Sequence, residues 1–112
     1  MDLNTAFDRL KQAHLNGHLS YEQRIELLTR LDVAVRRQRE DIVAACSADF
    51  GRRARIETLS ADVMISLDEI KYARKNLRRW MRPHSRSVNL TFKPARGEIR
   101  YTPLGVVGVV AP

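Results

Sequence analysis

The sequence predicts an α/β protein, of which this chain contributes three N-terminal helices, a β-hairpin and the first strand of an α/β domain. Apolar residues recur at helical spacing as far as Pro83. A shorter stretch with a period of two follows, and an unbroken β-branched apolar run comes last. The 112 residues suffice for about one domain. A hydrophobic content of 44% argues against a fully disordered chain.

The first predicted helix spans about Leu3–Leu15, and Asn16 and Gly17 are suited to end it. Its apolar positions fall on one face because they are three or four residues apart. They are Leu3, Ala6, Phe7 and Leu10.

One long helix is predicted from about Tyr21 to Ala48, with Gly51 placed to end it. A third helix follows, for which Thr58 or Ser60 is a suitable N-cap. It closes before Pro83, because the residue before a proline disfavours the α region.

The β-hairpin is predicted from two short strands, Ser87–Phe92 and Glu98–Thr102, joined by a turn at Pro94–Gly97. The final stretch, Pro103–Pro112, is continuously apolar, as in strands covered on both faces. A chain that stops on such a strand reads as the opening of a larger α/β domain, cut short. We therefore expect the isolated chain to be marginally folded or self-associating.

Composition also bears on location and partners. One cysteine cannot form an internal disulfide, and a reduced cytoplasmic setting is expected. No apolar run approaches the ~20 residues of a membrane-spanning helix. The N-terminus has neither the basic nor the apolar region of a secretory signal. We expect no membrane partner.

No catalytic or metal-binding residue emerges from the pattern. Cys46 lies among small helical residues with no adjacent cation to activate its thiol. His14 and His18 are four residues apart, but a helix end separates them and no third ligand is near. Gly105 and Gly108 match no phosphate-binding loop.

Among the features of the sequence pattern, the basic run from Lys71 to Arg86 is the strongest indication of a function. The chain has a net charge of +7, and this run contains no acidic residue. It is interpreted as a solvated or interface face, and a small nucleic-acid-binding or interaction module is the alternative. Its cations are Lys71, Arg74, Lys75, Arg78, Arg79, Arg82 and Arg86.

The stretch Tyr101–Pro112, with the sequence YTPLGVVGVVAP, resembles the start of the cofactor-binding domain of the aldehyde dehydrogenases. The resemblance implies that this stretch is the first strand of a Rossmann-type domain. The segments Ser20–Arg24, Ser47–Gly51 and Leu77–Pro83 are similar to the class-3 branch of that family, and most to its bacterial coniferyl aldehyde dehydrogenase group. The resemblance covers the whole chain but only the first part of a full family member.

The resemblance implies oxidation of an aldehyde, with coniferyl or another aromatic aldehyde as candidates, to a carboxylic acid. NAD or NADP is the implied cofactor, and Val110, Ala111 and Pro112 match backbone that borders its adenosine side. The family's catalytic cysteine, glutamate and asparagine match no residue of this chain, so the chain alone is expected to be inactive.

The resemblance also implies a division of the chain. Residues 1–83 correspond to an N-terminal helical layer, residues 84–102 to a hairpin arm of the oligomerisation region, and residues 103–112 to the first cofactor-domain strand. A small-molecule aldehyde and a second subunit, bound through the hairpin in a homodimer or higher oligomer, are the implied partners. Nucleic acid is not an expected partner on this interpretation.

Overall fold

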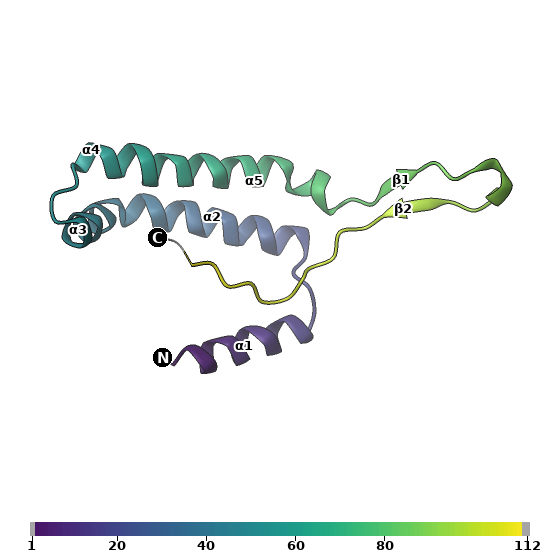
Figure 1. Cartoon of the computed structure of the whole chain (residues 1–112), viewed down its shortest axis with the longest axis horizontal. Helices are drawn as coiled ribbons and strands as arrows, with labels where there is room; N and C mark the ends of the chain where they lie inside the picture. The colour runs from purple at the N-terminus through teal and green to yellow at the C-terminus, as the bar shows by residue number, and fades with distance from the viewer. Residues whose placement is uncertain (1, 111–112) are drawn as a thin grey trace. The chain divides into compact units, whose positions relative to one another are not determined.

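The computed structural model describes residues 2–110, which form two units (Figure 1). One unit comprises residues 21–80, and the other comprises residues 2–20 together with residues 81–110. The first unit is entirely helical in its regular structure, whereas the second combines a helix with a small antiparallel sheet. The mainly helical prediction for the first 83 residues is therefore confirmed.

The predicted long helix is in fact two helices, α2 (Tyr21–Arg37) and α3 (Arg39–Phe50). Gln38 leaves helical geometry, with φ −94° and ψ 10°, and α3 turns sharply away from α2 (Figure 1). Basic residues end α2 and acidic residues begin α3, which is the arrangement that helix dipoles favour at a junction. Gly51 ends α3 with φ 78°, as predicted.

The third helix starts earlier than predicted. α4 (Arg55–Thr58) leads through a π-helical segment (Leu59–Met64) into α5 (Ile65–Met81). Neither Thr58 nor Ser60 is an N-cap, because both already lie within this helical run. The Ser60 hydroxyl instead donates to the carbonyl of Ile56 at 2.8 Å. The predicted helix end before Pro83 is confirmed.

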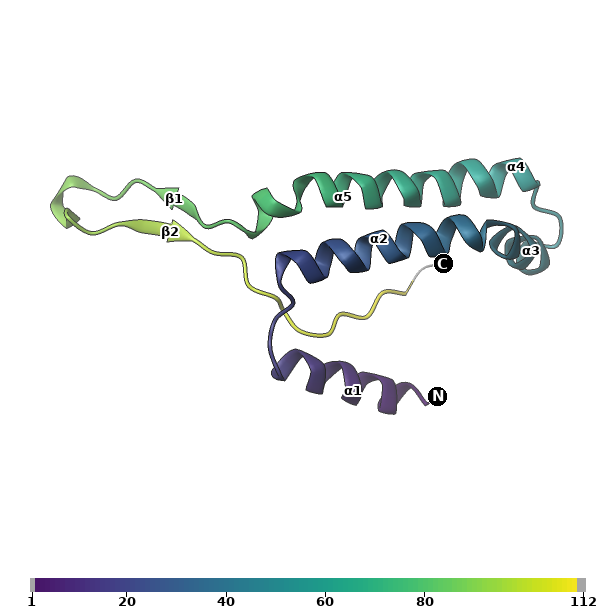
Figure 2. The same cartoon turned by 180° about the vertical axis from the view of Figure 1, so that it is seen from behind.

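Helices α2 and α5 run side by side in opposite directions (Figures 1 and 2). Near one end of the pair, the Arg78 guanidinium lies over the ring of Tyr21, 5.1 Å from its centroid. Val63 and Ile70 are the buried apolar side chains among the described residues. A core this small leaves much of the apolar stripe on both helices exposed.

Arg53 connects the loop after α3 to the π-helical segment. Its side chain is only 18% exposed, and its guanidinium lies 3.0 Å from the Asp62 carboxylate. The same group lies over the Phe50 ring, 5.2 Å from the centroid. These contacts position the start of the third helical run against the end of α3.

The second unit contains α1 (Leu3–Leu15), with the predicted bounds, and a two-stranded sheet. Strands β1 (His84–Arg86) and β2 (Gly97–Ile99) pair antiparallel, with Ser85 opposite Glu98. The hairpin is confirmed, but its first strand was placed too late in the sequence.

The predicted first strand and turn form most of a long loop instead. Leu90–Phe92 forms a 3₁₀ turn in it, and the Asn89 side chain accepts a hydrogen bond from the Thr91 amide. The Lys93–Pro94 peptide bond is cis. Local side-chain bonding of this kind competes with strand pairing, which explains why the alternating sequence did not form a strand here.

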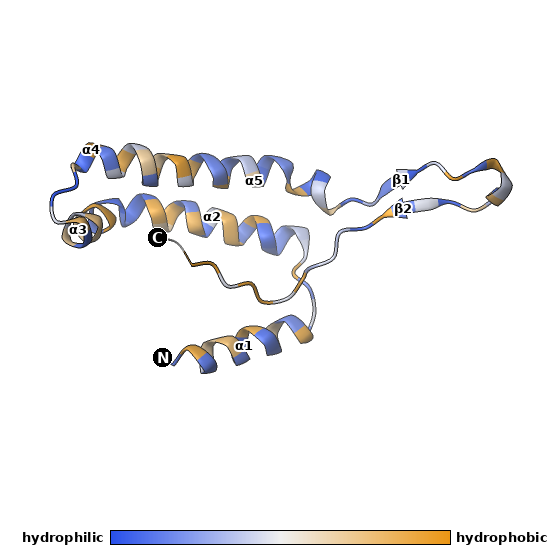
Figure 3. Cartoon of the chain, in the orientation of Figure 1, coloured by the Kyte–Doolittle hydropathy of each residue, from blue (hydrophilic) through white to orange (hydrophobic). Residues whose placement is uncertain are grey.

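The predicted final strand is absent from the described residues 103–110, which have no regular secondary structure. A strand requires hydrogen-bonding neighbours, and this segment has none in the described part of the chain. The segment is largely hydrophobic, as the orange stretches of the C-terminal trace show (Figure 3), and several of its apolar residues are exposed. Gly105 adopts φ 106°, a conformation that other residues rarely take.

Candidate functional site

Of the three residues expected to border a dinucleotide, Val110 belongs to the described structure. The Val110 side chain is 98% exposed, and its backbone belongs to the unpaired segment. Ala111 and Pro112 lie outside the described residues. The assignment of these three residues to the border of NAD or NADP therefore stays a prediction.

The histidine and cysteine candidates are not assembled into a reactive group. The rings of His14 and His18 lie 5.1 Å apart between centroids. Cys46 is half-buried, and no hydrogen bond reaches its sulfur from the described residues. Over residues 2–110, no group of three or more metal-ligating side chains comes together, and no helix is both long and apolar enough to cross a membrane.

The basic run is divided between the two units. Arg78 is engaged with Tyr21. The pKa of Asp32 on α2 is lowered mainly by its hydrogen bond from Arg36, and the charge of Arg74 adds to this effect. Within the described chain, the exposed Lys71, Lys75 and Arg79 have no carboxylate partner. They follow one another at four-residue spacing and so form a cationic stripe along α5. Part of the run thus supports the packing of α2 with α5, and part is free surface.

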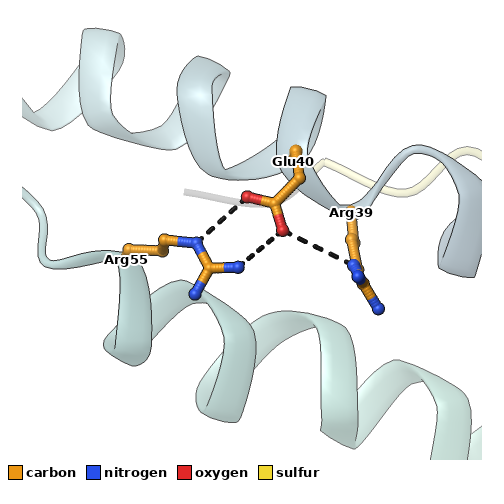
Figure 4. Close-up of polar contacts among 3 residues, drawn as sticks. All are labelled: Arg39, Glu40 and Arg55. Carbon is orange, nitrogen blue, oxygen red and sulfur yellow. Dashed lines mark hydrogen bonds and ion pairs between the residues drawn. The ribbon is translucent and has the colours of Figure 1, made fainter.

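A different cluster is the most developed polar arrangement in the described structure. Glu40, at the start of α3, accepts two hydrogen bonds from Arg55 on α4, at 3.0 and 2.6 Å (Figure 4). Arg39 approaches the same carboxylate more loosely, at 3.4 Å. The hydrogen bond from Arg55 is the main reason that the pKa of Glu40 lies below its ordinary value.

Arg36 joins this region from the end of α2. Its guanidinium binds the Asp32 carboxylate through two nitrogens, at 2.8 and 3.2 Å, and this hydrogen bonding lowers the pKa of Asp32. Together with Arg39 and Arg55 it borders a groove of about 360 Å³. Apolar side chains of the third helical run form the rest of the lining, namely Leu59, Val63, Met64 and Leu67.

Sequence reasoning missed this arginine-rimmed groove. Arg55 and Glu40 are 15 residues apart, so no helical spacing rule links them. The available signal was the change from basic to acidic residues at Arg36–Asp41, which marks the α2–α3 junction. A break at that junction brings α3 to the start of α4.

Comparisons with known proteins bear on the whole chain. The family model described as the aldehyde dehydrogenase family matches residues 2–112. A probable coniferyl aldehyde dehydrogenase of Pseudomonas aeruginosa is 38% identical over 98% of this chain. A coniferyl aldehyde dehydrogenase of a Pseudomonas species is 39% identical over the same share. Aldehyde dehydrogenase family 3 member H1 of Arabidopsis thaliana is 36% identical over 81% of the chain.

These matches confirm the resemblance seen in Tyr101–Pro112 and in the helical segments. The matches cover only part of each relative. The chain spans 23% of the length of the two Pseudomonas relatives and 19% of the Arabidopsis one. No solved structure matches the chain significantly.

Proposed function

The chain belongs to the aldehyde dehydrogenase family, and from this premise we propose that it forms the N-terminal part of an enzyme that oxidises an aldehyde to a carboxylic acid. The observation that carries the proposal is the similarity to coniferyl aldehyde dehydrogenases over 98% of the chain. An aromatic aldehyde of the coniferyl type is the proposed substrate. NAD or NADP is the proposed cofactor and would supply the hydride acceptor.

In this proposal the described residues have a structural role. Helices α2 and α5 supply a layer with a small core and exposed apolar side chains, which suits packing against further parts of a larger protein. The division into a helical layer at 1–83, a hairpin arm at 84–102 and a cofactor-domain strand at 103–112 is part of the proposal. So is the assignment of Val110, Ala111 and Pro112 to the border of the dinucleotide.

The proposed reaction places clear demands on the rest of the enzyme. Aldehyde, oxidised nicotinamide cofactor and water give carboxylic acid, reduced cofactor and a proton. A nucleophile must attack the carbonyl carbon, and donors must hold the oxyanion that forms. Cys46 does not meet the first demand, because it is half-buried in α3 and lacks a hydrogen-bonded base among the described residues.

Two further parts of the proposal concern assembly and location. A homodimer or higher oligomer would form through the region of β1 and β2, whose strands leave outer edges able to pair. A cytoplasmic setting agrees with the single free cysteine.

The decisive experiment uses the longer protein encoded at the source. Its coding sequence is read past Pro112, the protein is purified, and reduction of NAD or NADP is followed by absorbance with coniferyl aldehyde as substrate. We expect cofactor reduction with formation of the acid, and none with the 112-residue chain alone. Failure of the longer protein to reduce either cofactor with coniferyl or other aromatic aldehydes would contradict the proposal.

The nucleic-acid module is the second candidate, and one observation favours it. The stripe of Lys71, Lys75 and Arg79 lies on the same helix as the exposed aromatic residues Tyr72 and Trp80, whose rings are 5.7 Å apart. Cations beside stacking surfaces bind single strands with steep salt dependence. Absence of oligonucleotide binding at low salt would remove this candidate.

A further inference from the structure

The groove between α2, α3 and the third helical run combines apolar and basic side chains. Its floor is apolar, from side chains such as Leu59 and Met64, while three arginines stand at its rim. At about 360 Å³ it falls within the range of small-molecule sites. We propose that this groove binds a compact aryl monocarboxylate, with the ring on the apolar floor and the carboxylate on Arg39.

The net charge of the cluster at the rim determines which ligand charge the groove favours. Arg36, Arg39 and Arg55 contribute three positive charges, and their partners Asp32 and Glu40 contribute two negative ones. The cluster therefore has a surplus of one positive charge. A monoanion balances this surplus, whereas a dianion would place excess negative charge beside two existing carboxylates.

The position of the free donors indicates where the carboxylate binds. Arg36 and Arg55 each already use Nε and one terminal nitrogen on a carboxylate. Arg39 uses only Nε, at 3.4 Å from Glu40, and its side chain is 61% exposed. Its terminal nitrogens point away from Glu40 (Figure 4). They form the parallel pair of donors that a carboxylate accepts in a bidentate contact.

The rim also favours an aromatic ligand over an aliphatic one. Guanidinium groups stack on aromatic faces as well as binding anions. Arg53 and Arg78 already make contacts of this kind elsewhere in the same unit, with Phe50 and Tyr21. A flat ring under Arg36 or Arg55 would gain this contact, and a fatty chain would gain only burial.

The test measures binding directly by isothermal titration and by amide shifts in NMR spectra of the 112-residue chain. The probe is cinnamate, and the matched ligands are neutral cinnamyl alcohol, ring-free acetate and octanoate. We expect cinnamate to bind with a Kd on the order of 1 mM, as suits a small ligand on an open groove. Shifts should centre on Leu59, Met64 and Arg39, and the three matched ligands should bind at least several-fold more weakly.

Variants separate the site from general electrostatics. Arg39→Gln should weaken cinnamate binding about tenfold, because a charge-assisted contact is lost. Met64→Gln should also weaken cinnamate binding, because it replaces an apolar side chain of the groove floor with a polar one. Arg37→Gln is the matched control, since this exposed arginine borders a different groove and its loss changes the net charge equally. Circular dichroism confirms that each variant remains folded.

Several outcomes would overturn the inference. They are absence of cinnamate binding up to its solubility limit, equal binding of cinnamyl alcohol or octanoate, and equal weakening by Arg37→Gln. A groove occupied by a second copy of the chain would appear as a dimer in sedimentation that Met64→Gln dissociates, with no cinnamate binding. The proposal does not depend on aldehyde oxidation, because binding and cofactor reduction are measured separately.

Discussion

The buried hydroxyl of Thr58 lowers stability, because it loses its hydrogen bonds to water on folding and gains none in the described structure. Thr58 is 1% exposed, and its hydroxyl has no hydrogen-bond partner among the described residues. Valine has nearly the same shape without the hydroxyl. Thr58→Val should therefore leave the free energy of unfolding unchanged or raise it by up to about 1 kcal/mol, measured by denaturant unfolding.

The control for this substitution is Thr58→Ala, which also removes a methyl group from the buried position. It should lower the free energy of unfolding by about 1 kcal/mol relative to Thr58→Val. A Thr58→Val variant destabilised by more than this amount would show that the hydroxyl is hydrogen-bonded in solution.

The ion pairs of Asp32 and Glu40 predict sensitivity to acid. Hydrogen bonds from Arg36 and Arg55 lower the pKa of these carboxyl groups below their ordinary values of 3.8 and 4.5. In this range the unfolded chain binds more protons than the folded one, so stability falls as pH falls. The thermal midpoint should drop below about pH 4.5, and the drop should be shallower in Glu40→Gln. An identical pH profile for the variant would contradict this assignment.

At the scale of elements, the hairpin depends on Gly97. A Cβ at this position would lie 3.1 Å from Cγ1 of Val88 and 3.3 Å from the carbonyl oxygen of Arg86, its partner across the sheet. Gly97→Ala should therefore weaken the pairing of β1 with β2 by about 1 kcal/mol, seen as a loss of cross-strand NMR contacts. Gly108→Ala is the matched control, because nothing lies within 4 Å of its added Cβ. Equal effects of the two substitutions would count against steric crowding.

Elements marked by local signals were predictable from sequence. Gly17 and Gly51 fall at helix ends, and Pro83 follows the last helix, because their backbone preferences act within one or two residues. The break at Gln38 lacks glycine or proline and was missed. The first hairpin strand was misplaced because local hydrogen bonding by the Asn89 side chain replaces strand pairing in the alternating sequence Ser87–Phe92.

The groove was unpredictable for a different reason. Its lining comes from residues as far apart as Arg36 and Leu67, and only the packing of several helices brings them together. Pattern within one helix carries no information on such contacts. The family, in contrast, was predictable, because the sequence of Tyr101–Pro112 is specific without reference to any contact.

At the scale of the whole molecule, residues 103–110 are where the sequence-based prediction and the structure differ most. They have no regular structure here, while the sequence predicts a buried strand. In the 112-residue chain their amides should exchange rapidly with solvent, in contrast to the amides around Val63 and Ile70. In the longer protein they should become protected as strand neighbours form hydrogen bonds. Rapid exchange in both proteins would contradict the predicted strand.

The exposed apolar segment that ends the described chain also has a consequence for biosynthesis. In a family member about four times as long, the ribosome releases this N-terminal region first. At ordinary translation rates, the apolar side chains of this segment would stay exposed to solvent for tens of seconds, until later residues emerge and cover them. They include Leu104, Val109 and Val110. During that interval the nascent chain exposes a short apolar segment of high β propensity, which is the type of aggregation-prone sequence that chaperones bind.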